Sequence, residues 1–163
     1  MKWKKRDLKM DKIIFSRLKE PYGEFSNFYP IMISVDLKEY KSSEHYYQSK
    51  KYEGTKWEDH IRSQEKPFEA AREGRRDDLP LREDWKDVKL LVMRRALVAK
   101  FKRDDRMKNL LLSTGNTEIV EYSKKDYFWG RNEDGAGYNM LGKLLMELRE
   151  EIKIEEDRKE KFF

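Results

Sequence analysis

Three polar side chains in one short stretch of the sequence could act on a chemical bond together. The segment SSEHYYQSKK (residues 42–51) places Glu44, Gln48 and Lys51 on one face of a helix that begins near Ser43. A helix N-terminus favours the ionised form of a carboxylate in its first turn. A carboxylate among tyrosines suits stabilisation of a cationic transition state better than proton donation. The same pattern is also typical of a solvated, ion-paired helix face, so both interpretations stay open.

A second group of candidate residues lies in and around the loop KKDYFWG (residues 124–130). Asp126 could hold ribose hydroxyls or orient water while an aromatic neighbour stacks on a base, or it could simply form a turn. Trp85 opens a long predicted helix. It could stack on the same ring, although a lone tryptophan more often belongs to the core.

Four arginines crowd a short stretch of the chain, namely Arg72, Arg75, Arg76 and Arg82. Guanidinium groups bind phosphate through paired hydrogen bonds, so this cluster could clamp a phosphorylated substrate. It could equally be a solvated surface. The residue types alone do not separate the two interpretations.

Several common site types are disfavoured by the motifs. The segment GYNMLGK (residues 137–143) has P-loop spacing, but Leu144 replaces the residue that would bind Mg²⁺, so we interpret Gly142 as a close-packing point at a helix start. His45 and His60 are the two histidines, and neither belongs to a paired zinc motif. No cysteine and no GxSxG segment is present, so thiolate sites and a serine-hydrolase elbow are excluded. We expect no metal.

Composition predicts a single soluble domain. The chain has 163 residues, of which 42% are charged and 13% are aromatic, and this length suits one domain. No apolar run is long enough to span a membrane. Residues 1–12 carry six cations and two carboxylates and so account for +4 of the net charge of +5. The basic pI therefore says little about nucleic-acid binding by the rest of the chain. The absence of cysteine is compatible with a cytoplasmic location.

Hydrophobic periodicity and turn residues predict a mainly α fold: a single compact helical domain with a few short N-terminal β-strands. We predict a basic, mobile leader at 1–12, the domain at 13–153 and a charged, fraying tail at 154–163. Predicted helices cover 43–54, 56–64, 67–75, 82–104, 105–114 and 141–152; predicted strands cover 13–18 and 31–41, residues 117–123 form a strand or a helical turn, and 19–30 and 124–139 are loops.

Seven segments, taken together and in order, resemble the NADAR family. They run from about Phe15 to Glu150 and are GEFSNFYP, SSEHYYQSKK, PFEAAREGR, DWKDVKLLVMRRALVAKF, LLLSTG, EYSKKDYFWG and GAGYNMLGKLLMELRE. The combination of SEHYYQ, DYFWG and NMLGKLLMELRE is more specific than any single segment. The resemblance therefore covers nearly the whole predicted domain.

The resemblance implies a mainly helical N-glycosidase that cleaves a base–ribose bond without a metal or organic cofactor. Some family members act on phosphorylated ribosylamino-pyrimidine intermediates of riboflavin synthesis, and others remove ADP-ribose from guanine in nucleic acid. The resemblance places the catalytic glutamate, aspartate and amine at Glu44, Asp126 and Lys51. The predicted substrate-binding residues are Trp85, Ser26, Asn27, Phe28, Gln48, Arg75, Trp129 and Gly130.

Glycoside cleavage agrees with these residue types. An oxocarbenium-like ribose develops as the C1′–N bond breaks. Glu44 would then stabilise that cation and activate water, and Asp126 would bind the ribose hydroxyls. Lys51 would either orient Glu44 or attack C1′ to give a Schiff base.

Two non-enzymatic alternatives stay open. A binding module for ADP-ribose or NAD-type ligands would hold its ligand without releasing a base. A nucleic-acid-binding protein that uses the basic leader would lose affinity steeply with salt and on removal of residues 1–12.

Overall fold

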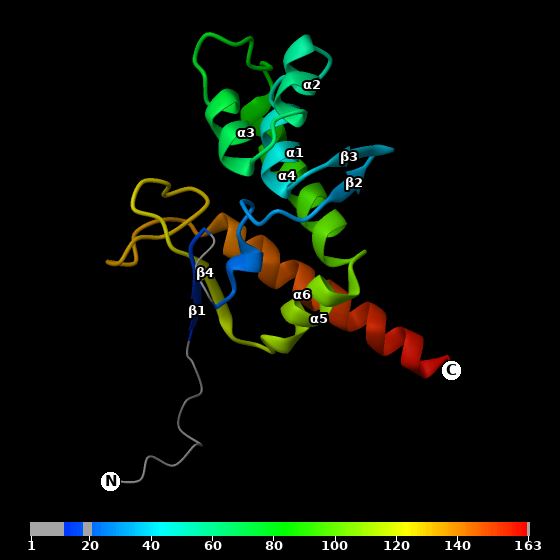
Figure 1. Cartoon of the computed structure of the whole chain (residues 1–163). Coiled ribbons are helices and arrows are strands. Elements are labelled where there is room, and N and C mark those ends of the chain that lie inside the picture. Colours follow the sequence, from blue (N-terminus) through cyan, green and yellow to red (C-terminus); the bar gives the residue numbers. More distant parts are fainter. Residues whose placement is uncertain (1–11, 18–20, 163) are drawn as a thin grey trace.

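The computed structural model describes residues 12–17 and 21–162, and the predicted mainly α-helical fold is confirmed. The helices of this part are α1 (Ser43–Lys50), α2 (Lys56–Arg62), α3 (Pro67–Gly74), α4 (Trp85–Phe101), α5 (Asp105–Ser113) and α6 (Met140–Lys161), with a short 3-10 helix η1 (Gly23–Phe25). The strands are β1 (Lys12–Phe15), β2 (Ile33–Val35), β3 (Lys38–Tyr40) and β4 (Glu118–Glu121). In Figure 1, α1, α2 and α3 gather at one end of α4, and α6 runs past its other end.

Two small sheets complete the fold. β2 and β3 form an antiparallel hairpin whose two turn residues, Asp36 and Leu37, have φ angles of 51° and 64°, as a tight hairpin turn requires. β1 pairs in parallel with β4, with Ile13 opposite Ile119. Residues 117–123, which the sequence left as a strand or a helical turn, therefore contain a strand. Its pairing with β1 brings together segments more than a hundred residues apart in the chain.

Local capping explains where several helices begin. Helix α1 begins at Ser43, as predicted; Ser42 is its N-cap, and the Ser42 hydroxyl accepts a hydrogen bond from the amide of His45 at 3.2 Å. Thr55 and Asp104 cap α2 and α5 in the same way. The first predicted helix is shorter than expected, because the chain turns after Lys50 and does not continue as a helix to residue 54.

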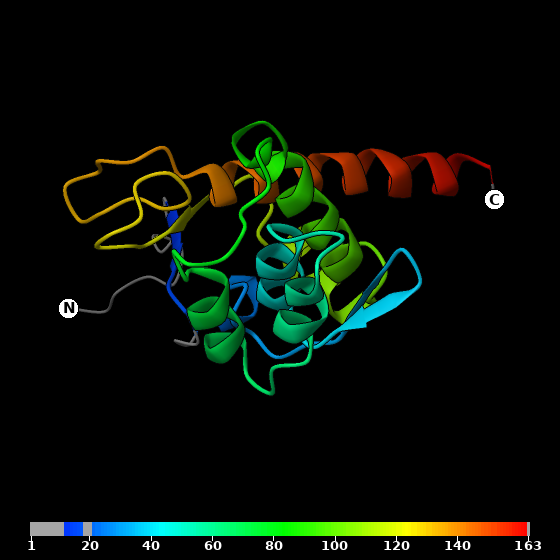
Figure 2. The same cartoon turned by 90° about the horizontal axis from the view of Figure 1, so that it is seen from above.

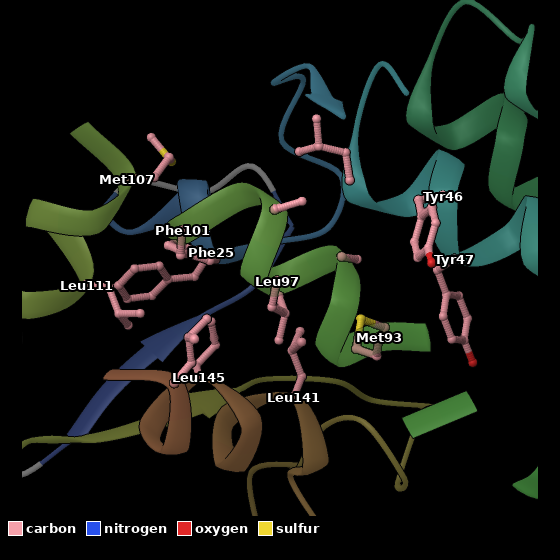
Figure 3. Close-up of a cluster of buried hydrophobic side chains, with 14 of the residues drawn as sticks. Phe25, Tyr46, Tyr47, Met93, Leu97, Phe101, Met107, Leu111, Leu141 and Leu145 are labelled. Carbon is pink, nitrogen blue, oxygen red and sulfur yellow. The ribbon is translucent and has the colours of Figure 1, made fainter. Parts of the chain in front are cut away.

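The main hydrophobic core lies between α4, α5, α6 and the segments before α1 (Figure 3). Phe25 contacts Phe15 edge-on at 5.8 Å and Phe101 at the same distance. Figure 3 shows Met107, Leu111 and Leu145 at one end of the cluster and Tyr47 near Met93 at the other. The core therefore extends to α1, which contributes Tyr46 and Tyr47.

The C-terminal segment differs from its prediction. We expected residues after 153 to fray, but α6 continues to Lys161. Lys102, the residue after α4, pairs with Glu155 at 2.7 Å, and Lys108 of α5 pairs with Glu156 at 3.3 Å. These pairs and the many good helix formers in the segment favour the helical state. Figure 2 shows the end of α6 extending beyond the rest of the molecule.

The division into leader, domain and tail stays a prediction. Residues 1–11 of the predicted leader lie outside the described residues, and Lys12 already belongs to β1. Within residues 12–17 and 21–162, no helix has the length and apolar character that a membrane span needs. In the same ranges, no group of three or more His, Asp or Glu side chains is arranged to hold a metal ion.

Candidate active site

A polar cavity of about 150 Å³ opens beside the N-terminal half of α1. This volume is roughly ten times the space that one bound water needs, so the cavity can take part of a small organic molecule. Its walls come from α1, α4 and several loops. The lining residues are Asn27, Phe28, Glu44, Tyr47, Gln48, Lys51, Arg75, Met93, Glu121, Asp126 and Trp129.

The polar face of α1 is buried rather than solvated. Glu44 is 4% exposed and Gln48 is 2% exposed. The Gln48 side-chain amide donates a hydrogen bond of 2.7 Å to Oε1 of Glu44, one turn earlier in the helix. Gly74 at the end of α3 allows this burial, because a Cβ there would collide with the side chain of Gln48. The solvated ion-paired face that the sequence left open is therefore not what the structure shows.

Burial opposes the effect that the helix N-terminus was expected to have on the pKa of Glu44. The helix N-terminus was expected to favour its ionised form, but loss of hydration raises the pKa of the Glu44 carboxyl above its usual value. The hydrogen bond from Gln48 and the charges of Arg75, Lys51 and Arg17 oppose this rise in the pKa of Glu44. A carboxylate with a raised pKa is a stronger base, which suits the removal of a proton from water.

Lys51 lies in the same pocket, with its ammonium facing aromatic rings. Its Nζ atom is 5.6 Å from the ring centre of Tyr47 and 6.0 Å from that of Trp85. It donates one long hydrogen bond, of 3.4 Å, to the carbonyl of Gly74. Burial lowers the pKa of Lys51 to about 8, partly opposed by the charge of Glu44. Among the described residues, no ion pair joins Lys51 to a carboxylate.

Asn27 and Phe28 are held in the pocket wall by buried hydrogen bonds. The hydroxyl of Ser43 donates to Oδ1 of Asn27 at 2.7 Å, and the amide of Glu44 donates to the Asn27 carbonyl at 3.1 Å. The buried ammonium of Lys100 donates to the carbonyl of Ser26 at 2.8 Å, and burial lowers the pKa of Lys100 to about 7. Ser26 therefore contributes to the position of this loop, and its side chain does not line the cavity.

Tyr47 connects the tryptophans beside the pocket. The indole of Trp129 donates a hydrogen bond of 3.2 Å to the Tyr47 hydroxyl, and the ring centres of Tyr47 and Trp85 are 5.1 Å apart. Trp85 is buried in the core and does not line the main cavity; it lines a neighbouring groove that shares Lys51 and Arg75 with it. The buried position agrees with the core interpretation of Trp85, and stacking on a substrate ring stays a prediction.

Asp126 both forms a turn and faces the cavity. Its Oδ1 atom accepts hydrogen bonds from the amides of Phe128 and Trp129, at 3.0 and 2.9 Å. The amides of Met140 and Leu141, at the start of α6, donate to the carbonyls of the same two residues. These amides are among those that a helix start leaves without partners, so α6 fixes the aromatic loop. Gly130 is buried in this loop and lies outside the cavity lining.

The four arginines differ in their contacts. Arg76 binds Glu73 and Asp78, and Arg82 binds Asp84 and Glu53, so both have carboxylate partners. Arg72 is exposed and does not line the cavity. Arg75 lines it, and no ion pair to Arg75 is formed among the described residues. One arginine of the predicted clamp therefore reaches the pocket.

Eight predicted site residues line one cavity, and three do not. Those in the lining are Asn27, Phe28, Glu44, Gln48, Lys51, Arg75, Asp126 and Trp129; those outside it are Ser26, Trp85 and Gly130. Sequence reasoning missed Tyr47, Met93 and Glu121 as lining residues. Glu121 follows the apolar run of β4 directly, and a carboxylate at the end of a buried strand was the signal that could have revealed it.

Comparison with known proteins supports this picture of the chain. The NADAR domain family model matches residues 14–153. The chain is 45% identical over 143 residues to the N-glycosidase YbiA of Escherichia coli. The matched region covers 88% of this chain and 89% of that protein. The chain is also 39% identical over 140 residues to a riboflavin biosynthesis protein of Vibrio vulnificus, of which the match covers 38%. An NMR structure of the E. coli protein YbiA superposes with a TM-score of 0.82 at 44% identity, covering 89% of this chain and 86% of that one.

Proposed function

The chain belongs to the NADAR domain family, and we propose that it is an N-glycosidase that hydrolyses the C1′–N bond of a phosphorylated ribosylamino-pyrimidine. One observation carries the proposal: Glu44 is buried against Gln48 in a cavity that Lys51 and Asp126 also line. The chain is 45% identical to an N-glycosidase along most of both chains.

The proposed mechanism follows from the charges that face the sugar. Cleavage of the C1′–N bond develops positive charge on the ribose, and an anionic Glu44 stabilises that charge. The raised pKa of Glu44 suits the same carboxylate to take a proton from the attacking water. Asp126 uses the oxygen that is not engaged by the loop amides to bind ribose hydroxyls. Arg75 binds the phosphate.

The substrate class is supported by one group of relatives. The Vibrio vulnificus protein is named for riboflavin biosynthesis, and so is a chloroplastic protein of Zea mays that is 39% identical over 155 residues. Both relatives are much longer than the matched part, which spans 38% and 25% of them. A ribosylated pyrimidine is therefore the first substrate to test, and ADP-ribosylated guanine in DNA is the second.

The test pairs each substrate with the wild-type protein and with the Glu44→Gln variant, and mass spectrometry follows the released base. We expect the wild type to release the pyrimidine, and Glu44→Gln to lose about a thousandfold in kcat/KM because the isosteric amide is neutral. Release of unmodified guanine alone would reassign the substrate to ADP-ribosylated nucleic acid. Near-normal turnover by Glu44→Gln would overturn the role of Glu44.

Ligand binding without cleavage is the less favoured alternative, because full-length relatives are named N-glycosidases. Tight binding of ADP-ribose with no base released from either substrate would favour it. We also propose a cytoplasmic location, supported by the cysteine-free composition. Cell fractionation with antibodies against the protein tests the location.

A further inference from the structure

Glu121 is a third carboxyl group in the candidate active site. It is the last residue of β4, and it lines the cavity together with Glu44 and Asp126. Its backbone is held firmly: the Glu121 amide donates to Oδ1 of Asn139 at 3.0 Å, and its carbonyl accepts from the amide of Arg131 at 2.9 Å. The carboxyl group therefore projects from a fixed point of the fold.

The surroundings of Glu121 favour the neutral acid. Among the described residues, no hydrogen bond or ion pair is formed by its carboxyl group. Desolvation raises the pKa of Glu121 to about 8, and the negative charges of Asp126 and Glu44 raise it further, against a lowering by Arg17. Arg17 is exposed and lies over the ring of Phe28, at 5.2 Å. Near neutral pH, the carboxyl group of Glu121 keeps its proton.

Glu44 lies in the same pocket in contrasting surroundings. Desolvation raises the pKa of Glu44 as it does that of Glu121, but Gln48 donates a hydrogen bond to Glu44, and the charges of Arg75, Lys51 and Arg17 oppose the rise. Glu121 has two carboxylates as its nearest charged neighbours and one opposing cation. Where the surroundings of two carboxyls in one site differ in this way, the pair divides into an acid and a base.

We propose that Glu121 is the acid that protonates the departing base nitrogen, while Glu44 takes the proton of the attacking water. This inference rests on the proposed function. As the C1′–N bond breaks, its electron pair moves to the nitrogen, which takes the proton of Glu121. The water oxygen bonds to C1′ and gives one proton to Glu44. That proton returns to Glu121 through solvent, so each turnover consumes one water. The departing nitrogen needs the same proton if Lys51 attacks C1′ first.

A leaving-group comparison tests this role. The two substrates are the phosphorylated ribosylamino-pyrimidine and 4-nitrophenyl riboside 5-phosphate, whose nitrophenolate departs without protonation. We expect Glu121→Gln to lose about a hundredfold or more in kcat/KM on the pyrimidine but less than about fivefold on the nitrophenyl substrate. Tyr47→Phe is the matched control, because it removes a hydroxyl group from another residue that lines the cavity. It should lower kcat/KM on both substrates by similar factors.

A second measurement does not depend on whether the nitrophenyl compound is accepted. In Glu121→Ala at mildly acidic pH, where part of the added formate is protonated, formic acid can occupy the vacated space and supply the missing proton. We expect pyrimidine release by this variant to rise with formate concentration, and release by Glu44→Gln not to respond. Circular dichroism and calorimetric binding of ribose 5-phosphate check that each variant is folded.

The outcomes separate the two proposals. If the wild type cleaves neither substrate, the proposed function fails. If the wild type cleaves the pyrimidine, two results overturn the role of Glu121: equal losses on both substrates, or a Glu121→Ala variant that formate does not rescue. A leaving-group dependence that appears in Tyr47→Phe would transfer the acid role to Tyr47.

Discussion

Lys51 and Glu44 occupy one helix face, but the contacts that position Glu44 come from elsewhere. Gln48 donates to the Glu44 carboxyl, and the Glu44 amide donates to the carbonyl of Asn27. The ammonium of Lys51 instead faces aromatic rings and has one long hydrogen bond. Of the two jobs that the residue types allow Lys51, these contacts favour attack on C1′ over the orientation of Glu44.

We therefore expect sodium cyanoborohydride to trap a Lys51–sugar adduct during turnover. Since the pKa of Lys51 is lowered to about 8, its neutral amine becomes more abundant by about tenfold per pH unit up to pH 8 and then levels off. The trapping rate should follow this curve, as measured by intact-protein mass spectrometry. Lys89→Arg, a change at another lysine near the site, should still form the adduct, and Lys51→Arg should not. Turnover without any adduct would return Lys51 to an orienting role.

Glu121 should also affect stability in a pH-dependent way. Its folded pKa of about 8 lies above its ordinary value of 4.5, so the folded state binds the extra proton. Its contribution to the free energy of unfolding is complete below pH 4.5 and is lost as the pH rises through 8. Glu121→Gln removes this loss. In urea unfolding, the free energy of unfolding of Glu121→Gln relative to that of the wild type should rise by ~1–3 kcal/mol between pH 5 and pH 8.5. If the difference in the free energy of unfolding between the two proteins stays constant across this range, Glu121 does not hold its proton in the folded state.

At the scale of elements, the junction of β4 and α6 organises the aromatic side of the pocket. Asn139 precedes α6 in the left-handed conformation, with φ of 50°, and its side chain bonds the Ile119 carbonyl and the Glu121 amide. Gly142, in the first turn of α6, lies against the Ile119 carbonyl and the Asn139 side chain. The sequence interpretation of Gly142 as a close-packing point is therefore confirmed.

Gly142→Ala should destabilise the protein. In a helix interior, alanine normally stabilises the folded state by about 1 kcal/mol relative to glycine. At position 142 the added Cβ would meet the Ile119 carbonyl and the Asn139 side chain. We expect a loss of about 2 kcal/mol in the free energy of unfolding, measured by chemical denaturation. Lys143→Ala, at the exposed next position of the same helix, should change stability by less than about 0.5 kcal/mol. A Gly142→Ala protein more stable than the wild type would contradict the close contact.

At the scale of the whole molecule, the cavity is assembled from residues between 27 and 129. Residues 1–12 carry +4 of the net charge of +5, and the one residue of this segment that the structure describes, Lys12, does not line the cavity. We expect the charge of this segment to act by attracting polyanions rather than in the bond-breaking step.

Deletion of residues 1–11 should leave kcat/KM on the ribosylated pyrimidine within about twofold of the wild type, at both 50 and 200 mM salt. If DNA is a substrate, the deletion should weaken DNA binding and reduce its salt dependence, because fewer phosphate contacts release fewer counterions. Steady-state kinetics and fluorescence anisotropy measure the two effects. A deletion variant that is folded but inactive on the pyrimidine would show that this segment takes part in the site.

The features that could be predicted from the sequence alone are those that depend on near neighbours along the chain. Helical periodicity placed Glu44, Gln48 and Lys51 on one face, and the N-cap at Ser42 set where that face begins, because both are properties of one helical segment. The mainly α fold and most helix positions follow from the same local patterns. Asp126 and Trp85 were candidates from their segments, and the family resemblance assigned Asp126 a catalytic role and Trp85 a substrate-binding role.

Which side chains share the cavity depends on the tertiary structure. The parallel pairing of β1 with β4 joins segments more than a hundred residues apart, and the fold brings Glu121 into one cavity with Asp126 and Glu44. Burial raises the pKa of Glu44 against the effect expected from its helix position, since desolvation depends on every element around a carboxyl group and not on its own helix. The fold also brings Arg75 to the cavity and pairs Arg76 and Arg82 with carboxylates.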